Sequence, residues 1–274
     1  MLTMMMAPGG GFVAIHRPVP PMAYLDHCAL RKFSEDAKLG PRLTSALHAR
    51  NGTLAISWLN LGEYATVTDP GQRRAVEQFL DGILPGIFCI DVDPAVMDRE
   101  GGSQPFPYAD QAVANLFFSG HKQTVRLFTA AKLFEPLNHP LLIDSKERLA
   151  GKVRPRLEAL RAEYAASPTF RAQVRKADST VGTVAPSRTR AIFRTVAGMF
   201  FPDPTSPLQD NDVLDFLHTM IPVSYCDAVL LDGGAWDRVE RARRKLRRAG
   251  VEIAESFPMR GDGIERFLEY LERA

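Results

Sequence analysis

CDAVLLDGGAW (Cys226–Trp236) places four apolar residues between two aspartates and follows them with two glycines. The apolar run from Ala228 to Leu231 is typical of a short buried strand. Asp232 stands where this strand ends and the chain must bend. Asp before Gly is a common turn former, but a carboxylate at the end of a core strand can also be one wall of an acidic site. Other acidic residues of the chain decide between the two interpretations.

The segments on both sides of this strand alternate between helix and strand patterns. Ser34, Ser57 and Asp69 are placed to cap helices. The predicted helices include residues 148–178, 210–221 and 235–250, and the predicted strands include residues 22–26, 53–57, 86–93 and 251–257. Strands that alternate with helices of this length predict an α/β fold, with three α/β/α layers around a mostly parallel central sheet.

The alternation is interrupted after Pro94, which divides the chain into four parts. Residues 1–21 end in a stretch rich in Pro and Gly and are predicted to be a flexible extension. Residues 22–94 and 208–274 carry the alternating pattern, so we expect them to be the two parts of one domain. Residues 95–207 are helix-rich and irregular, which predicts a helical insertion between those parts.

The composition narrows the class of protein. Hydrophobic residues make up 45% and charged residues 24% of the chain, which is ordinary for a folded domain. Three scattered cysteines without a CxxC spacing argue against a zinc knuckle and favour a reducing compartment, so we expect a cytoplasmic protein. No apolar run approaches the roughly 18 residues of a membrane span. The 34 basic and 32 acidic side chains nearly balance, so the net charge indicates no partner.

Four acidic residues fall on strand ends and adjoining helices. Asp26 and Asp232 each end a strand, Glu63 follows the second strand, and Asp215 lies on the helix before the strand that Asp232 ends. Ligands of parallel α/β sheets bind outside the C-terminal ends of the strands, so we expect these acids to converge. Clustered carboxylates stay ionised only near cations, and oxygen ligands suit Mg²⁺ or Mn²⁺. Two such ions would support phosphodiester hydrolysis.

Each acid also has an ordinary structural explanation. The two strand-end aspartates are turn or cap residues when taken singly, and Asp212 can cap its helix. Asp212, Asp215 and His218 share one helical face, where His218 is expected to support the site through hydrogen bonds rather than as a ligand. Glu63 on an apolar face and Asp215 in mid-helix are harder to explain by structure alone.

Three blocks of the sequence resemble PIN-domain nucleases. They are YLDHCAL (residues 24–30), GTLAISWLNLGEYA (52–65) and NDVLDFLHTMIPVSYCDAVLLD (211–232). The resemblance extends over residues 22–93 and 208–257, and the long middle segment departs from a minimal member of that family. Each block alone is weakly specific, and it is their order and their elements together that carry the resemblance.

The resemblance implies that the protein is a metal-dependent hydrolase. It would be an endoribonuclease that uses Mg²⁺ or Mn²⁺. Metal-binding and catalytic roles are implied for Asp26, Glu63, Asp215 and Asp232, and a supporting role for Asp227. The expected substrate is nucleic acid, with RNA favoured over DNA, and the expected protein partner is an antitoxin-like protein or a second copy of the chain. No membrane partner is expected.

A rival acidic motif is FCIDVDPAV, residues 88–96, which resembles the nucleophile motif of haloacid dehalogenase-type phosphatases. In that interpretation Asp91 attacks phosphorus and Asp93 acts as acid and base. Ala95 stands where Thr or Val is expected, and no later lysine with an acidic pair accompanies the motif. A strand end followed by an Asp-Pro turn is the simpler explanation.

Two basic helical segments are candidates for contact with nucleic acid. RVERARRKLRR (residues 238–248) and the basic segment of residues 152–176 are either solvated helix faces or phosphate contacts. The favoured hypothesis is an RNA-cleaving enzyme that binds through these helices. The non-enzymatic alternative is a PIN-like scaffold or regulatory domain that works through the insertion.

Overall fold

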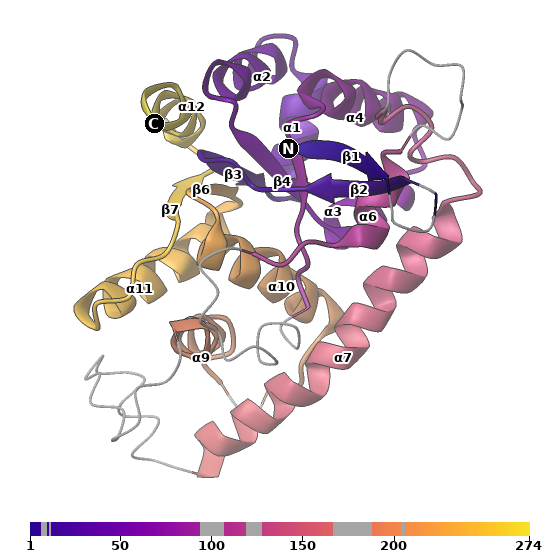
Figure 1. Cartoon of the computed structure of the whole chain (residues 1–274). Coiled ribbons are helices and arrows are strands. Elements are labelled where there is room, and N and C mark those ends of the chain that lie inside the picture. The colour runs from indigo at the N-terminus through magenta and orange to yellow at the C-terminus, as the bar shows by residue number, and fades with distance from the viewer. Residues whose placement is uncertain (7–9, 11, 94–106, 119–127, 167–187, 204–205) are drawn as a thin grey trace.

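The centre of the molecule is a parallel sheet of five strands in the order β5-β4-β3-β6-β7. A computed structural model describes the chain except residues 7–9, 11, 94–106, 119–127, 167–187 and 204–205 (Figure 1). The strands are β3 (Met22–Leu25), β4 (Thr53–Ile56), β5 (Ile87–Cys89), β6 (Ala228–Leu231) and β7 (Glu255–Pro258). Helices cover both faces of this sheet, so the predicted α/β/α fold is confirmed.

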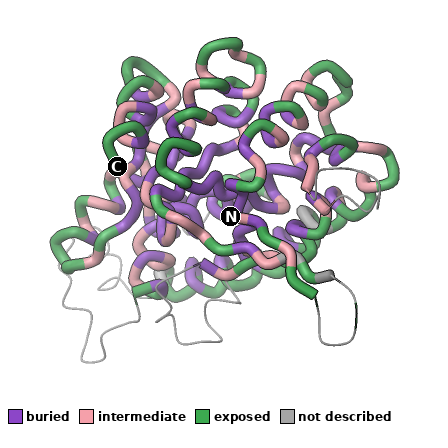
Figure 2. The backbone as a smooth tube through the Cα atoms, turned by 45° about the horizontal axis from the view of Figure 1, so that its top comes forward, coloured by how far each residue is buried: buried purple, intermediate pink, exposed green. Residues whose placement is uncertain are grey.

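The two helical layers bury the two faces of each strand. One layer contains α1 (His27–Glu35), α2 (Leu39–Arg50), α4 (Pro70–Ile83) and α12 (Gly263–Arg273); the other contains α9 (Arg188–Phe200), α10 (Asp210–Tyr225) and α11 (Gly233–Arg248). Alternate residues point to opposite faces of a strand. Met22 and Tyr24 therefore join the core under α10, while Ala23 and Leu25 join the core under α1. Figure 2 shows the strands buried and the outer helical turns exposed.

Helix starts follow the capping residues of the sequence, with one correction. Ser57 caps α3 (Trp58–Ala65) together with Asn60, and Asp69 caps α4, as predicted. Ser34 was predicted to begin a helix, but it lies inside α1, where its hydroxyl donates to the Arg31 carbonyl. The start of α1 lies eight residues earlier because Asp26, at the end of β3, already accepts the Ala29 N–H group.

The N-terminal residues form a hairpin, which corrects the prediction of a flexible extension. Strands β1 (Leu2–Met6) and β2 (Phe12–His16) pair antiparallel. The hairpin is attached to the domain: Leu2 is buried and donates its N–H to the Pro85 carbonyl, and His16 Nδ1 accepts the Cys89 N–H. Burial of one apolar residue and pairing of the backbone groups outweigh the turn-forming composition that suggested flexibility.

The described part of the predicted insertion is helical and belongs to the same core. It contains α6 (Gln111–Leu116), α7 (His139–Ala166) and α9. Helix α7 packs against α3 and α10, and α9 packs against α10 and α11. The helix predicted over residues 148–178 is confirmed as far as Ala166, and its remainder lies outside the described residues. None of the helices in the described ranges is long and apolar enough to cross a membrane.

Candidate acidic site

The sheet brings Asp26 and Asp232 together at its C-terminal edge. They follow β3 and β6, which are neighbours paired through Leu25 and Leu230. The chain builds β4 and β5 on one side of β3, and β6 and β7 on the other. The gap between β3 and β6 is therefore the point where the strand order reverses, which is where parallel α/β sheets bind ligands.

Both strand-end aspartates cap helices, and the Asp26 carboxylate also contacts the backbone of Asp232. Asp26 Oδ1 accepts the Ala29 N–H at 2.7 Å, and its Oδ2 accepts the N–H of Asp232. Asp232 Oδ1 in turn accepts the N–H groups of Gly234 and Ala235 at 2.6 and 2.9 Å. The ordinary explanation of these residues as caps is therefore correct. Two carboxylates nevertheless lie side by side, each at the positive end of a helix.

Glu63 is held by two histidines from different elements. Its Oε2 lies 3.1 Å from Nε2 of His218 on α10 and 3.3 Å from Nδ1 of His27 on α1. The other ring nitrogen of His218, Nδ1, is 2.8 Å from the buried Tyr24 hydroxyl. This chain of contacts joins β3, α10, α3 and α1, so the orientation of Glu63 depends on the packing of all four elements.

Asp215 completes the group of four acids from the α10 side. Burial raises its pKa and the positive charge of His218 opposes that shift, while the charges of Asp232 and Glu63 raise the pKa further. Burial likewise raises the pKa of Asp26 to about 6, with a further contribution from Asp232. The charges of Glu63 and Asp232 therefore act on Asp215, and the charge of Asp232 acts on Asp26.

Two of the predicted supporting acids lie elsewhere. Asp227 precedes β6, and its Oδ2 accepts the Met22 N–H at 2.7 Å. This contact is at the N-terminal edge of the sheet, about five residues or roughly 17 Å along the strand from Asp232. Asp212 is a capping residue, since its Oδ2 accepts the Gln209 N–H at 3.3 Å at the start of α10. The hydrogen bonds of Asp227 and Asp212 therefore do not involve the acidic site. His218, the third predicted supporting residue, does contact Glu63.

Three residues near the acids were missed by sequence reasoning. Tyr24 and His27 flank Asp26 closely in the sequence, but their contacts with His218 and Glu63 required the fold. Arg238 on α11 carries a charge that opposes the rise in the pKa of Asp215 caused by burial, and it stacks over the Phe200 ring, 4.8 Å from its centroid. The only signal for Arg238 was its place in the basic run after Asp232.

The rival acidic motif lies after β5, an edge strand. Asp91 Oδ1 accepts the Asp93 N–H at 2.8 Å, and Lys152 Nζ lies 3.6 Å from Asp93 Oδ2. Burial raises the pKa of Asp91 to about 6, assisted by the charge of Asp110. This group is separated from β6 by β4 and β3, so it lies away from the reversal of strand order. The phosphatase alternative stays a prediction.

The side chains of the acidic site are not a ready-made metal centre. Within the described ranges, no group of three or more His, Cys, Asp or Glu residues is arranged so that it could hold a metal ion. The chemistry of the donors still fits a hard cation, because a carboxylate has about four lone-pair positions. Side-chain rotation would be needed to gather three of these donors around one ion.

Comparisons with protein-family models, with curated proteins and with solved structures found no match to this chain.

Proposed function

We propose that the protein is a metal-dependent nuclease that hydrolyses phosphodiester bonds, with RNA favoured over DNA. The observation that supports the proposal is that Asp26 and Asp232 end neighbouring strands where the strand order reverses, with Asp215 under the influence of the charges of Asp232 and Glu63. Four elements contribute these acids, and burial with mutual repulsion raises the pKa of two of them. Such crowding is unfavourable for stability and is relieved by a bound cation.

The four carboxylates are the residues that would hold Mg²⁺ or Mn²⁺. When bound, such an ion lowers the pKa of a water molecule and neutralises charge on the phosphate. His218, fixed by Tyr24, orients Glu63. Arg238 adds a positive charge beside Asp215, where a phosphate group of the substrate would be attracted.

The decisive experiment compares two aspartates on the same pair of strands. Asp26→Asn keeps the shape of the side chain but removes the charge that would hold a cation. We expect this variant to lose Mn²⁺-dependent cleavage of a mixed-sequence single-stranded RNA, together with the stabilisation that Mn²⁺ gives in a thermal melt. Asp227→Asn, the same change at the opposite edge of the sheet, should keep both properties.

Two results would contradict the proposal. If Mn²⁺ neither stabilises the wild type nor supports cleavage of RNA or DNA, the protein is a scaffold or regulatory domain rather than a nuclease. If Asp227→Asn impairs cleavage as strongly as Asp26→Asn, the loss reflects general damage to the sheet rather than removal of a metal ligand.

A further inference from the structure

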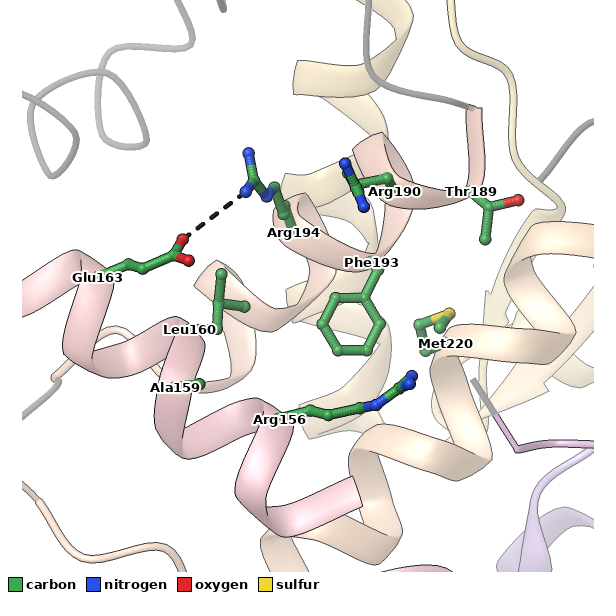
Figure 3. Close-up of a pocket in the computed structure, with 9 residues that line it drawn as sticks. All are labelled: Arg156, Ala159, Leu160, Glu163, Thr189, Arg190, Phe193, Arg194 and Met220. Atoms are coloured by element: carbon green, nitrogen blue, oxygen red, sulfur yellow. Dashed lines mark ion pairs between the residues drawn. The ribbon is translucent and has the colours of Figure 1, made fainter. Parts of the chain in front are cut away.

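A cavity of about 270 Å³ lies between α7, α9 and α10 (Figure 3). Its volume is near the lower end of the range of pockets that take small ligands. Arg156 of α7 and Arg190 and Arg194 of α9 line it, together with the aromatic ring of Phe193. The cavity lies on the side of the molecule formed by the predicted insertion, and no step of the proposed hydrolysis requires it.

The charge of the cavity suits an anion. Among the described residues that line it are three arginines and one acid, Glu163, whose carboxylate lies 3.7 Å from Arg194 Nη2. The described lining therefore carries more positive than negative charge. Arg156 and Arg190 are exposed, so their guanidinium groups can reach a ligand without losing contact with water. Guanidinium groups match phosphate oxygens in geometry as well as in charge.

The interior of the cavity suits a flat apolar group. Figure 3 shows the Phe193 ring between the Arg156 side chain and the α9 arginines, with Met220 and Leu160 nearby. Phe193 is half-buried and packs edge-on against Phe216, with ring centroids 5.3 Å apart. The ring is thus held in place while part of its surface stays accessible. Aromatic rings beside arginines are the usual platform for the bases of single-stranded nucleic acids.

The cavity and the acidic site share one helix. Met220 lines the cavity and Asp215 belongs to the acids, and both lie on α10. Their separation of five residues corresponds to about 7.5 Å along the helix axis. Arg238, which acts on Asp215, stacks on Phe200 of α9, the helix that carries Arg190 and Phe193. Helices α9 and α10 therefore connect the cavity to the acidic site.

We propose that this cavity binds one nucleotide of a single-stranded RNA substrate, with the base against Phe193 and the phosphate at Arg156, Arg190 and Arg194. The identity of the ligand as substrate rests on the proposed nuclease function, but the site itself is separate from the four acids. The insertion would then hold the strand that the acidic site cuts.

Binding is measured without cleavage, by fluorescence anisotropy of a labelled single-stranded RNA of ten nucleotides in EDTA. Arg190→Gln and Phe193→Leu should each weaken binding about tenfold, or about 1.4 kcal/mol, because the first removes a phosphate contact and the second removes a stacking surface. Arg190→Gln should also reduce the dependence of log affinity on log salt by about one, whereas Phe193→Leu should leave that slope unchanged. Arg74→Gln, an exposed arginine on α4 in the opposite helical layer, is the matched control and should bind as the wild type does.

Competition experiments identify the chemistry of the ligand. Adenosine monophosphate should displace the RNA at lower concentrations than inorganic phosphate does, because only the nucleotide carries a base. Equal competition by the two would overturn the proposal in favour of a simple anion site. Unchanged binding by Arg190→Gln, whose side chain is exposed and whose loss leaves the core intact, would also overturn it.

The two proposals fail in different ways. If the wild type cuts RNA but the cavity variants bind it normally, the nuclease function stands and the cavity proposal is wrong. If the cavity variants lose RNA binding but the wild type cuts nothing with Mn²⁺, the cavity proposal stands and the nuclease function is wrong.

Discussion

Asp26 carries two roles that act on stability in opposite directions. Its carboxylate accepts two backbone N–H groups, which ties α1 to the end of β6. The same carboxylate is 8% exposed and lies beside Asp232, so its negative charge is poorly solvated. Asp26 is therefore a helix cap in the structure and, in the proposed function, also a cation ligand.

The raised pKa of Asp26 predicts that the metal-free protein loses stability as pH rises. The pKa is about 6 in the folded state against an ordinary 3.8, so the folded state binds more protons in this range and the free energy of unfolding falls between about pH 4 and 6. The loss is at most about 3 kcal/mol. Urea unfolding in EDTA at several pH values should show this decline in wild type and a weaker one in Asp26→Asn. Equal slopes for the two proteins would contradict the assignment to Asp26.

Helix α3 determines where Glu63 lies. The helix has eight residues and begins with a capping box in which Ser57 and Asn60 bond reciprocally, and the Asn60 amide also donates to the Leu25 carbonyl at the end of β3. Ser57 and Asn60 are both buried. A helix this short depends on such ends and on packing rather than on its own propensity. The position of Glu63 relative to Asp26 therefore depends on this cap as well as on the packing of α3.

Replacement of Ser57 by Ala should affect both stability and the site. Loss of an N-cap hydroxyl costs about 1–2 kcal/mol of unfolding free energy, and a loosened α3 should weaken the stabilisation that Mn²⁺ gives. Ser45→Ala, on the exposed face of α2, is the matched control and should change neither quantity. Chemical denaturation with and without Mn²⁺ measures both effects. A stability loss with an unchanged Mn²⁺ effect would show that Glu63 does not depend on this cap.

The molecule as a whole is one folded body in its described parts, because the predicted insertion shares its core with the sheet. Leu157 of α7 and Val196 of α9 belong to the same buried cluster as Val229 of β6 and Phe216 of α10. An insertion that folded as a separate domain would have its own hydrophobic core. Instead, α7 and α9 cover α10, the helix that presents Asp215.

Removal of a single α7 side chain should therefore destabilise the entire protein. Leu157→Ala leaves a cavity in the shared core and should lower the free energy of unfolding by about 2–5 kcal/mol. Leu137→Ala, at a position that is 88% exposed, is the control and should have little effect. Far-ultraviolet circular dichroism and tryptophan fluorescence should report one coincident transition. A first transition that is seen by circular dichroism but not by tryptophan fluorescence would instead show that the insertion unfolds independently.

Features that depend on neighbouring residues could be predicted from the sequence. The five central strands, the caps at Ser57 and Asp69, and the α/β class follow from apolar runs and capping residues, which act over a few neighbours. The placement of Asp26 and Asp232 at strand ends follows in the same way. Asp227 could have been separated from them by the same reasoning, because a residue that begins a parallel strand lies at the opposite edge from one that ends it.

Contacts between distant segments were decided only by the tertiary structure. Tyr24 meets His218 across 194 positions of the chain, and no local pattern encodes that pairing. The N-terminal hairpin depends on a place to dock beside β5, so composition alone suggested a flexible segment. The arginine-lined cavity exists because α7 and α9 pack against α10. A strand or a cap depends on interactions among adjacent residues, whereas a site between helices depends on how separate buried faces come together.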